Sequence, residues 1–265
     1  MSPVTVPLRA HLRDKGEVHL GLGGARERIV SGLSEAETRA VLALGPMTAQ
    51  QWGSAYTTRP PSTRWPTVVT LLGNAAASVT APDEAVGAVQ VAGTGDVCDS
   101  VRDVLQAMGA TPSRTALTLA VLIAAEQVPA AAGSPWHRDG IAHLPVVLGA
   151  GRVVIGPLIR PGKGPCLRCL DHYRAAHDPG WAHTAAQTWI TRDDAVDYDD
   201  VNGLLNPVFA PADLRAVVAG LVGLVARGHR GGRPLPVGVS LTVTSPNPRV
   251  QHRLWRSHPR CCPDG

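Results

Sequence analysis

The chain has 265 residues, a formal net charge of +4 and a mean hydropathy of +0.03. Its 44% hydrophobic and 17% charged residues allow a substantial core, which excludes disorder of the whole chain, and its length suggests one or two domains. The longest apolar stretch, Ala116 to Ala125, is far shorter than the roughly 20 residues of a membrane span. The N-terminus lacks the apolar segment of a secretory signal, so we expect a cytoplasmic protein without membrane contact.

Arginine dominates the basic residues, since only Lys15 and Lys163 of the 25 are lysine. A GC-rich coding bias would explain this composition, and so would a surface that binds carboxylates through bidentate contacts. A nucleic-acid-binding protein usually has more positive charge and more stacking aromatic residues than the three Tyr and one Phe found here. The composition therefore argues against a nucleic-acid partner.

The first 80 residues predict three short strands followed by three helices. Ser34 and Glu37 have the spacing of a capping box, which marks the start of a helix. The third helix carries Arg64 as its one basic residue, so it suits an extended peptide added to a sheet edge better than it suits DNA. The expected strands are Val4–Leu12, Glu17–Leu22 and Glu27–Val30, and the expected helices are Ser34–Leu44, Thr48–Trp52 and Thr63–Ala77.

The remainder of the chain alternates strands and helices, which predicts an α/β layer fold. A Pro-, Ala- and Asp-rich stretch, Val79–Gly87, is expected to be a linker between the two parts. The expected strands after it are Ala88–Ala92, Ala116–Ile123, Leu144–Leu148, Arg152–Ile155 and Val237–Val243, and the expected helices are Asp99–Met108 and Pro211–Gly228.

A glycine turn follows the first strand of the second part. Gly93 and Gly95 stand where a dinucleotide-binding motif begins, but Cys98 occupies the position of the third glycine. Asp96 and Asp99 flank the turn and would repel a phosphate. We interpret the region as a Rossmann-like fold that has lost nucleotide binding.

The cysteines indicate a metal site. Their odd count, without a secretory signal, argues against a disulfide framework. Cys166 and Cys169 form a C-x-x-C motif, and Cys261 and Cys262 supply two further thiols for a tetrahedral structural zinc site. Buried thiols, or a redox dithiol at the C-x-x-C motif, are the alternatives. Adjacent cysteines chelate one ion awkwardly, so His258 is an alternative to one of them, while the isolated Cys98 is expected in the core.

The segment His143–Asp178 contains the run G-P-L-x-x-P-G-x-x-P-C-L-R-C-L-D and is followed late in the chain by H-P-R-C. It resembles the ThiF-like proteins of azole- and azoline-forming peptide pathways. The resemblance implies an α/β fold like that of ubiquitin-activating-type adenylating enzymes. Residues 1–80 would form a winged helix-turn-helix-like peptide-recognition module, and residues 88–265 a degenerate Rossmann-like ThiF-type domain with a zinc knuckle and a C-terminal zinc staple.

The same resemblance implies a function in the biosynthesis of ribosomally made peptide antibiotics. The protein would bind the leader of a precursor peptide and present its core to a YcaO-type cyclodehydratase, which uses ATP to convert Cys, Ser or Thr into azolines. ThiF-like relatives are often dimeric, so a homodimer is also expected. The alternatives are an ATP-dependent adenylating enzyme of the same fold and a winged-helix DNA-binding regulator. The implied peptide-binding residues are Arg26, Glu27, Arg28, Ile29, Val30, Arg64, Val68, Leu71 and Leu72.

Overall fold

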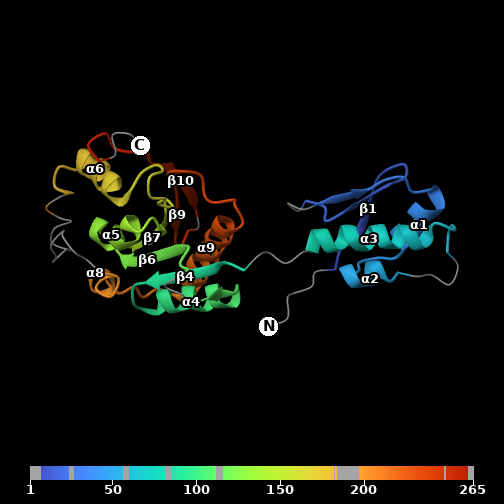
Figure 1. Cartoon of the computed structure of the whole chain (residues 1–265), viewed down its shortest axis with the longest axis horizontal. Helices are drawn as coiled ribbons and strands as arrows, with labels where there is room; N and C mark the ends of the chain where they lie inside the picture. Colours follow the sequence, from blue (N-terminus) through green and yellow to red (C-terminus); the bar gives the residue numbers. More distant parts are fainter. Residues whose placement is uncertain are drawn as a thin grey trace. The chain divides into compact units, whose positions relative to one another are not determined.

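The computed structural model describes residues 7–23, 27–55, 60–80, 85–111, 116–181, 183, 197–247 and 249–261. Two compact units divide the chain, Met1–Asp83 and Glu84–Gly265 (Figure 1). Among the helices of the described residues, none combines the length and the apolar character that a bilayer crossing requires.

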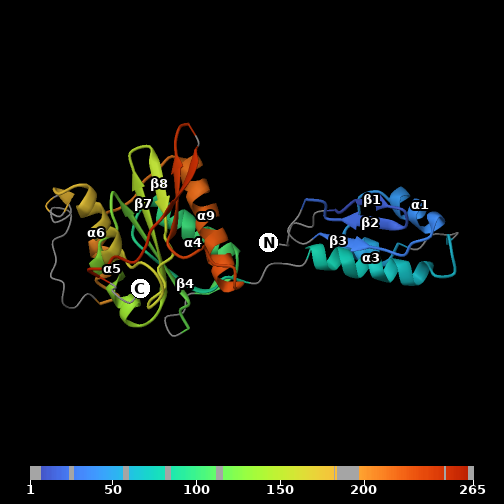
Figure 2. The ribbon, with the colours of Figure 1, turned by 90° about the horizontal axis from the view of Figure 1, so that it is seen from above.

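The first unit consists of a three-stranded antiparallel sheet and three helices (Figure 2). Its strands pair in the order β1-β2-β3, so that β3 lies at an edge. The elements are β1 (Ala10–Asp14), β2 (Glu17–Leu20), β3 (Arg28–Val30), α1 (Glu35–Ala43), α2 (Ala49–Gly53) and α3 (Trp65–Thr80). This order agrees with the prediction, although β1 starts at Ala10 and the first residues of the expected strand lie outside the described part.

Helix starts in this unit follow the predicted capping chemistry. The Ser34 side chain accepts a hydrogen bond from the Glu37 N–H, and the Glu37 carboxylate accepts one from the Ser34 N–H at 2.8 Å. Thr48 and Gln51 form the same reciprocal pair at the start of α2. These bonds satisfy backbone donors that have no partner within the helix.

The second unit is built on a seven-stranded mixed sheet in the order β10-β9-β8-β7-β6-β4-β5. The strands from β7 to β5 pair in parallel, and β8, β9 and β10 extend the sheet in antiparallel fashion. They are β4 (Gly87–Ala92), β5 (Ala110–Thr111), β6 (Leu119–Ala125), β7 (Ala142–Gly149), β8 (Arg152–Ile155), β9 (Val239–Thr244) and β10 (Val250–Leu254).

Helices cover both faces of this sheet (Figure 2). On one face lie α4 (Asp96–Ala107) and α9 (Ala212–Arg230); on the other lie α5 (Ala130–Arg138), α6 (Leu167–His177) and the short α8 (Val201–Leu204). Val121 of β6 packs in the core beneath α4 and α9, whereas its neighbour Leu122 packs in the core on the opposite face. An apolar run without alternation is expected of a strand that is buried on both faces.

Several expectations need correction. The expected linker is wrong at both ends, because Val79 belongs to α3 and Gly87 begins β4. Helix α4 begins at Asp96, three residues before the expected Asp99. The sequence pattern does not predict α5, α6 or β10, all of which the structure contains.

Candidate functional site

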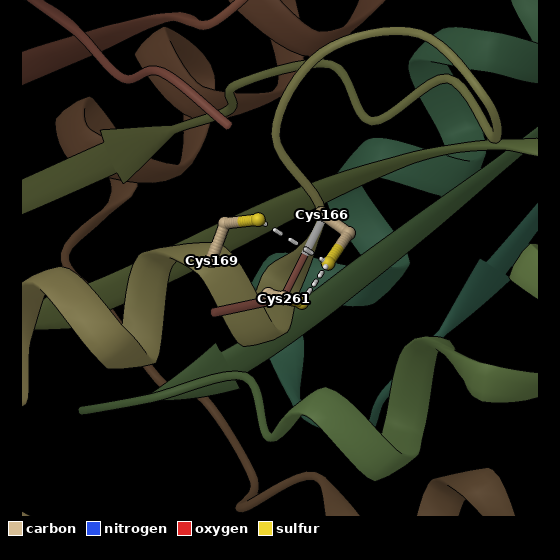
Figure 3. A group of neighbouring side chains, drawn as sticks. All are labelled: Cys166, Cys169 and Cys261. Atoms are coloured by element: carbon tan, nitrogen blue, oxygen red, sulfur yellow. Dashed lines mark hydrogen bonds between the residues drawn. The ribbon is translucent and has the colours of Figure 1, made fainter. Parts of the chain in front are cut away.

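Three of the four expected metal ligands come together in the second unit (Figure 3). Cys166 is the N-cap residue of α6, Cys169 lies in the first turn of that helix, and Cys261 reaches them from the C-terminal segment. The Cys166 sulfur lies 3.7 Å from that of Cys169 and 3.4 Å from that of Cys261. All three sulfur atoms lie within 4.8 Å of one another.

This spacing fits a metal ion better than a disulfide. A disulfide would bring two sulfurs to about 2.0 Å, whereas a tetrahedral zinc site with bonds of about 2.3 Å separates them by about 3.8 Å. The backbone N–H of His258 also donates to the Cys169 sulfur at 3.3 Å, which supports negative charge on a thiolate ligand.

The fourth ligand is not among the described residues of the cluster. Cys262 lies outside the described part of the chain. The His258 ring does not join the three sulfurs: its Nδ1 accepts from the Arg260 N–H at 3.2 Å, and the ring stacks on His172 at 4.7 Å. Cys98 is a core residue as predicted, with none of its surface exposed.

The glycine turn after β4 is covered by a distant segment of the same chain. The Gly93 N–H donates to the Asn202 side chain at 2.8 Å, across 109 residues of sequence. The Val208 N–H donates to the Thr94 carbonyl at 2.9 Å, and the Val208 carbonyl accepts from the Val97 N–H at 3.5 Å. The local sequence does not predict that this segment contacts the glycine turn, because the two segments are more than 100 residues apart.

The acidic residue at the start of α4 fastens the same segment. Asp96 accepts hydrogen bonds from the Ala210 N–H and from the Arg215 guanidinium, both at 3.0 Å. Gly95 adopts a φ of 103°, and a Cβ atom there would lie 2.1 Å from the Val208 carbonyl oxygen. In a dinucleotide-binding fold the phosphates lie at this helix N-terminus; in this chain Val208 and its neighbours occupy it.

The expected peptide-binding residues divide into buried and exposed groups. Val30 is 7% exposed, and Val68 and Leu72 are fully buried in the core of the first unit. By contrast, Ile29 and Leu71 are 44% and 45% exposed. Of the remaining expected residues, Glu27, Arg28 and Arg64 are exposed, and Arg26 lies outside the described residues.

The exposed members flank one edge of the sheet. Among the described strands, β3 pairs with β2 alone, so its outer edge is open. The Arg64 guanidinium donates to the Gly32 carbonyl just beyond β3, at 3.5 Å. Leu71 follows Arg64 by about two helical turns and therefore lies on the same side of α3. The side of α3 from which Arg64 reaches the residue after β3 therefore also carries a half-exposed apolar side chain.

Comparisons with known proteins place this geometry in a structural context. No protein-family model matches the chain, and neither does any curated protein. Solved structures do resemble it. A heterocyclase in complex with substrate and cofactor matches at 13% identity with a TM-score of 0.54, over 96% of this chain and 38% of the heterocyclase. The heterocyclase TruD matches at 14% identity with a TM-score of 0.54, over 97% of this chain and 42% of TruD.

E. coli MccB matches at 13% identity with a TM-score of 0.49, over 96% of this chain and 94% of MccB. The likeness to the heterocyclases shows a shared fold. The chain spans about two fifths of the length of these two heterocyclases.

Proposed function

We propose that the protein binds the leader segment of a ribosomally synthesised precursor peptide and presents its core to a separate YcaO-type cyclodehydratase. The observation that carries this proposal is the open edge of β3, together with the half-exposed Leu71 of α3. The fold shared with the heterocyclases supports it.

The leader would bind as an additional strand. An extended peptide that pairs with β3 satisfies the outward N–H and C=O groups of that strand, and its side chains give specificity. Leu71 would provide an apolar anchor on the side of α3 that faces β3, and Arg64 would lie at one end of the groove. Val30, Val68 and Leu72 would support the groove from within the core rather than contact the peptide.

The covered glycine turn favours a binding role over adenylation. The Gly93 and Val97 N–H groups already have partners within the chain, and Asp96 places a carboxylate at the start of α4. A nucleotide would need to displace the Val208 segment and overcome the repulsion from Asp96. If the protein adenylated its peptide, purified protein would catalyse ATP–pyrophosphate exchange in the presence of the precursor; we expect none.

A structural zinc ion would complete the second unit. Cys166, Cys169 and Cys261 would hold it, with a fourth ligand from outside the described residues. Bound zinc would link the start of α6 to the C-terminal segment and stabilise the fold without taking part in a reaction.

The decisive experiment measures leader affinity by calorimetry, using synthetic peptides that correspond to any short reading frames found beside the gene of this protein. We expect Leu71→Asp to weaken leader binding by about tenfold or more, because a charge replaces an apolar anchor. Thr70→Asp is the matched control, since Thr70 is exposed on the same helix but points about 100° away from Leu71. Equal affinities for the two variants, or no binding by the unaltered protein, would contradict the proposal. Val30→Asp is a poor test, because it places a carboxylate in the core.

A further inference from the structure

A pocket of 330 Å³ opens between the C-terminal half of α5 and the start of α6. His143, the second residue of β7, lines it. The glycine turn instead follows the carboxyl end of the parallel strand β4, so the pocket lies at the opposite end of the parallel strands. Its volume is at the lower end of the roughly 300–1,000 Å³ usual for ligand sites.

His143 presents an acceptor to this pocket. The residue is 1% exposed, and its Nδ1 lies 3.1 Å from the Ile141 carbonyl oxygen. Because a carbonyl only accepts, Nδ1 carries the proton and Nε2 keeps a lone pair. Burial lowers the pKa of His143 to about 4, so the ring is neutral near pH 7.

The lone pair on Nε2 has no hydrogen-bond partner in the part of the chain that the structure describes. Gly133 lies against it: a Cβ atom at that position would come within 3.1 Å of Nε2 and within 2.6 Å of a Leu167 methyl group, so glycine is needed there. A ligand in the pocket that carries a hydrogen-bond donor can pair with this acceptor.

The rest of the pocket favours negative charge. Arg138 and Arg168 line it, and the described lining residues include no Asp or Glu. The start of α6 also faces it, so the dipole of this eleven-residue helix favours an anion. Asp139 lies 3.8 Å from the Arg138 guanidinium. However, its carboxylate accepts a hydrogen bond from the Tyr198 hydroxyl, and Asp139 is not among the described residues that line the pocket.

Cys166 and Cys261, two of the three clustered cysteines, also line the pocket. A bound zinc ion would offset much of their negative charge, so the cationic side chains would still dominate the pocket. The relevant state for ligand binding is therefore the zinc-loaded protein.

We propose that this pocket binds the C-terminal carboxylate of a peptide. The carboxylate accepts hydrogen bonds from the Arg138 and Arg168 side chains near the positive end of the α6 dipole, and the adjacent amide N–H of the peptide donates to His143 Nε2. A peptide C-terminus carries an anion and a donor a few bonds apart, which matches the pairing of donors and one acceptor in the pocket. This site is independent of the leader groove, since it lies in the other unit of the chain.

The test titrates the zinc-loaded full chain with N-acetyl-glycyl-glycine, with its C-terminal amide and with inorganic phosphate. Calorimetry gives the affinities, and the ¹⁵N resonance of His143 Nε2 reports whether the lone pair gains a donor. We expect the acid to bind about tenfold more tightly than the amide and to shift this resonance. Arg138→Gln should weaken the binding of the acid about tenfold. Arg39→Gln, which changes an exposed residue of the first unit, should leave this affinity unchanged.

Zinc content and the thermal unfolding profile must match between the variants, and Arg168→Gln replaces Arg138→Gln if the latter does not fold. Equal binding of acid and amide, binding of neither, or binding of phosphate alone would each overturn the proposal. So would an equal loss in Arg39→Gln, because it would show that net charge rather than this pocket attracts the ligand.

Discussion

Cysteine residues of this chain occupy two contrasting environments. Cys98 lies on the inner face of α4 with no exposed surface, and burial raises the pKa of its thiol to about 11, so it remains protonated. Cys166 and Cys169 instead lie at the start of α6, where they form a cluster with Cys261 that could hold a metal ion. Cys98 is therefore a structural core residue, whereas the clustered cysteines are candidate metal ligands.

The first prediction concerns metal content. Cys166→Ser should lose bound zinc, and the thermal midpoint of the second unit should fall by on the order of 10 °C, because the ion no longer links α6 to Cys261. Cys98→Ala, the matched cysteine substitution, should keep the full zinc content. Zinc analysis and thermal unfolding measure both effects. A Cys166→Ser protein with normal zinc would disprove the ligand assignment.

A second prediction follows from the buried imidazole of His143. Burial lowers its pKa from 6.5 to about 4, so between these values the unfolded chain binds a proton that the folded chain does not. Stability from this residue is therefore present above pH 6.5 and is lost as the pH falls towards 4, by about 3 kcal/mol in total. Urea unfolding at several pH values should show a shallower acid-side loss for His143→Gln. Identical pH slopes in the two proteins would refute the assignment.

Some features could be predicted from sequence because their signals are local. The Ser34 cap follows from its spacing to Glu37, and the C-x-x-C motif marks Cys166 and Cys169 as site residues. The role of His143 could not be foreseen, since it depends on Gly133 and on the pocket beside α6. Contacts between segments that are distant in sequence leave no local pattern.

At the level of helices and strands, the missed elements lack the usual signatures. Helix α5 contains Pro135, which normally interrupts a helix, and α6 begins within the C-x-x-C motif, which indicated a metal site rather than a helix. Strand β10 is exposed along its whole length, so it shows no alternation of apolar and polar residues. Amphipathic or fully buried elements such as α4 and β6 were foreseen, because burial leaves a pattern in the sequence.

A third prediction compares two helical glycines. A Cβ at Gly73 of α3 would lie 2.7 Å from the Gly53 Cα of α2, whereas Gly220 of α9 has nothing within 4 Å. Gly73→Ala should therefore destabilise the first unit by about 1–3 kcal/mol through overpacking. Gly220→Ala should stabilise the second unit by about 1 kcal/mol, because alanine favours a helix. Denaturant unfolding measures both. If Gly73→Ala left the free energy of unfolding unchanged, α2 and α3 could move apart without loss of stability, which would contradict the prediction.

On the scale of the whole molecule, the chain is organised as two units with separate cores. The first core is centred on Trp52 and Trp65, and the second unit has apolar clusters on both faces of its sheet. The α/β character of the second unit was predictable from its alternating elements. The antiparallel extension was not, since β10 could not be recognised and the pairing of β8 with β9 depends on contacts across the whole unit.

The fourth prediction is that the two units respond differently to metal removal. The three cysteines belong to Glu84–Gly265, so a chelator should lower the unfolding midpoint of that unit and leave the transition of Met1–Asp83 unchanged. Calorimetric scans with and without chelator test this, with tryptophan fluorescence assigning the transitions. A parallel shift of both transitions would show that the units unfold as one.

Gly95 shows how a familiar sequence feature can serve a different purpose. Any larger residue there would collide with the Val208 carbonyl, and the φ of 103° also favours glycine, so the position requires glycine without a cofactor. Motif searches that score glycines after a first β-strand would count this turn in favour of cofactor handling. In chains of this kind, the segment that overlies the turn is a better guide to catalytic competence than the turn itself.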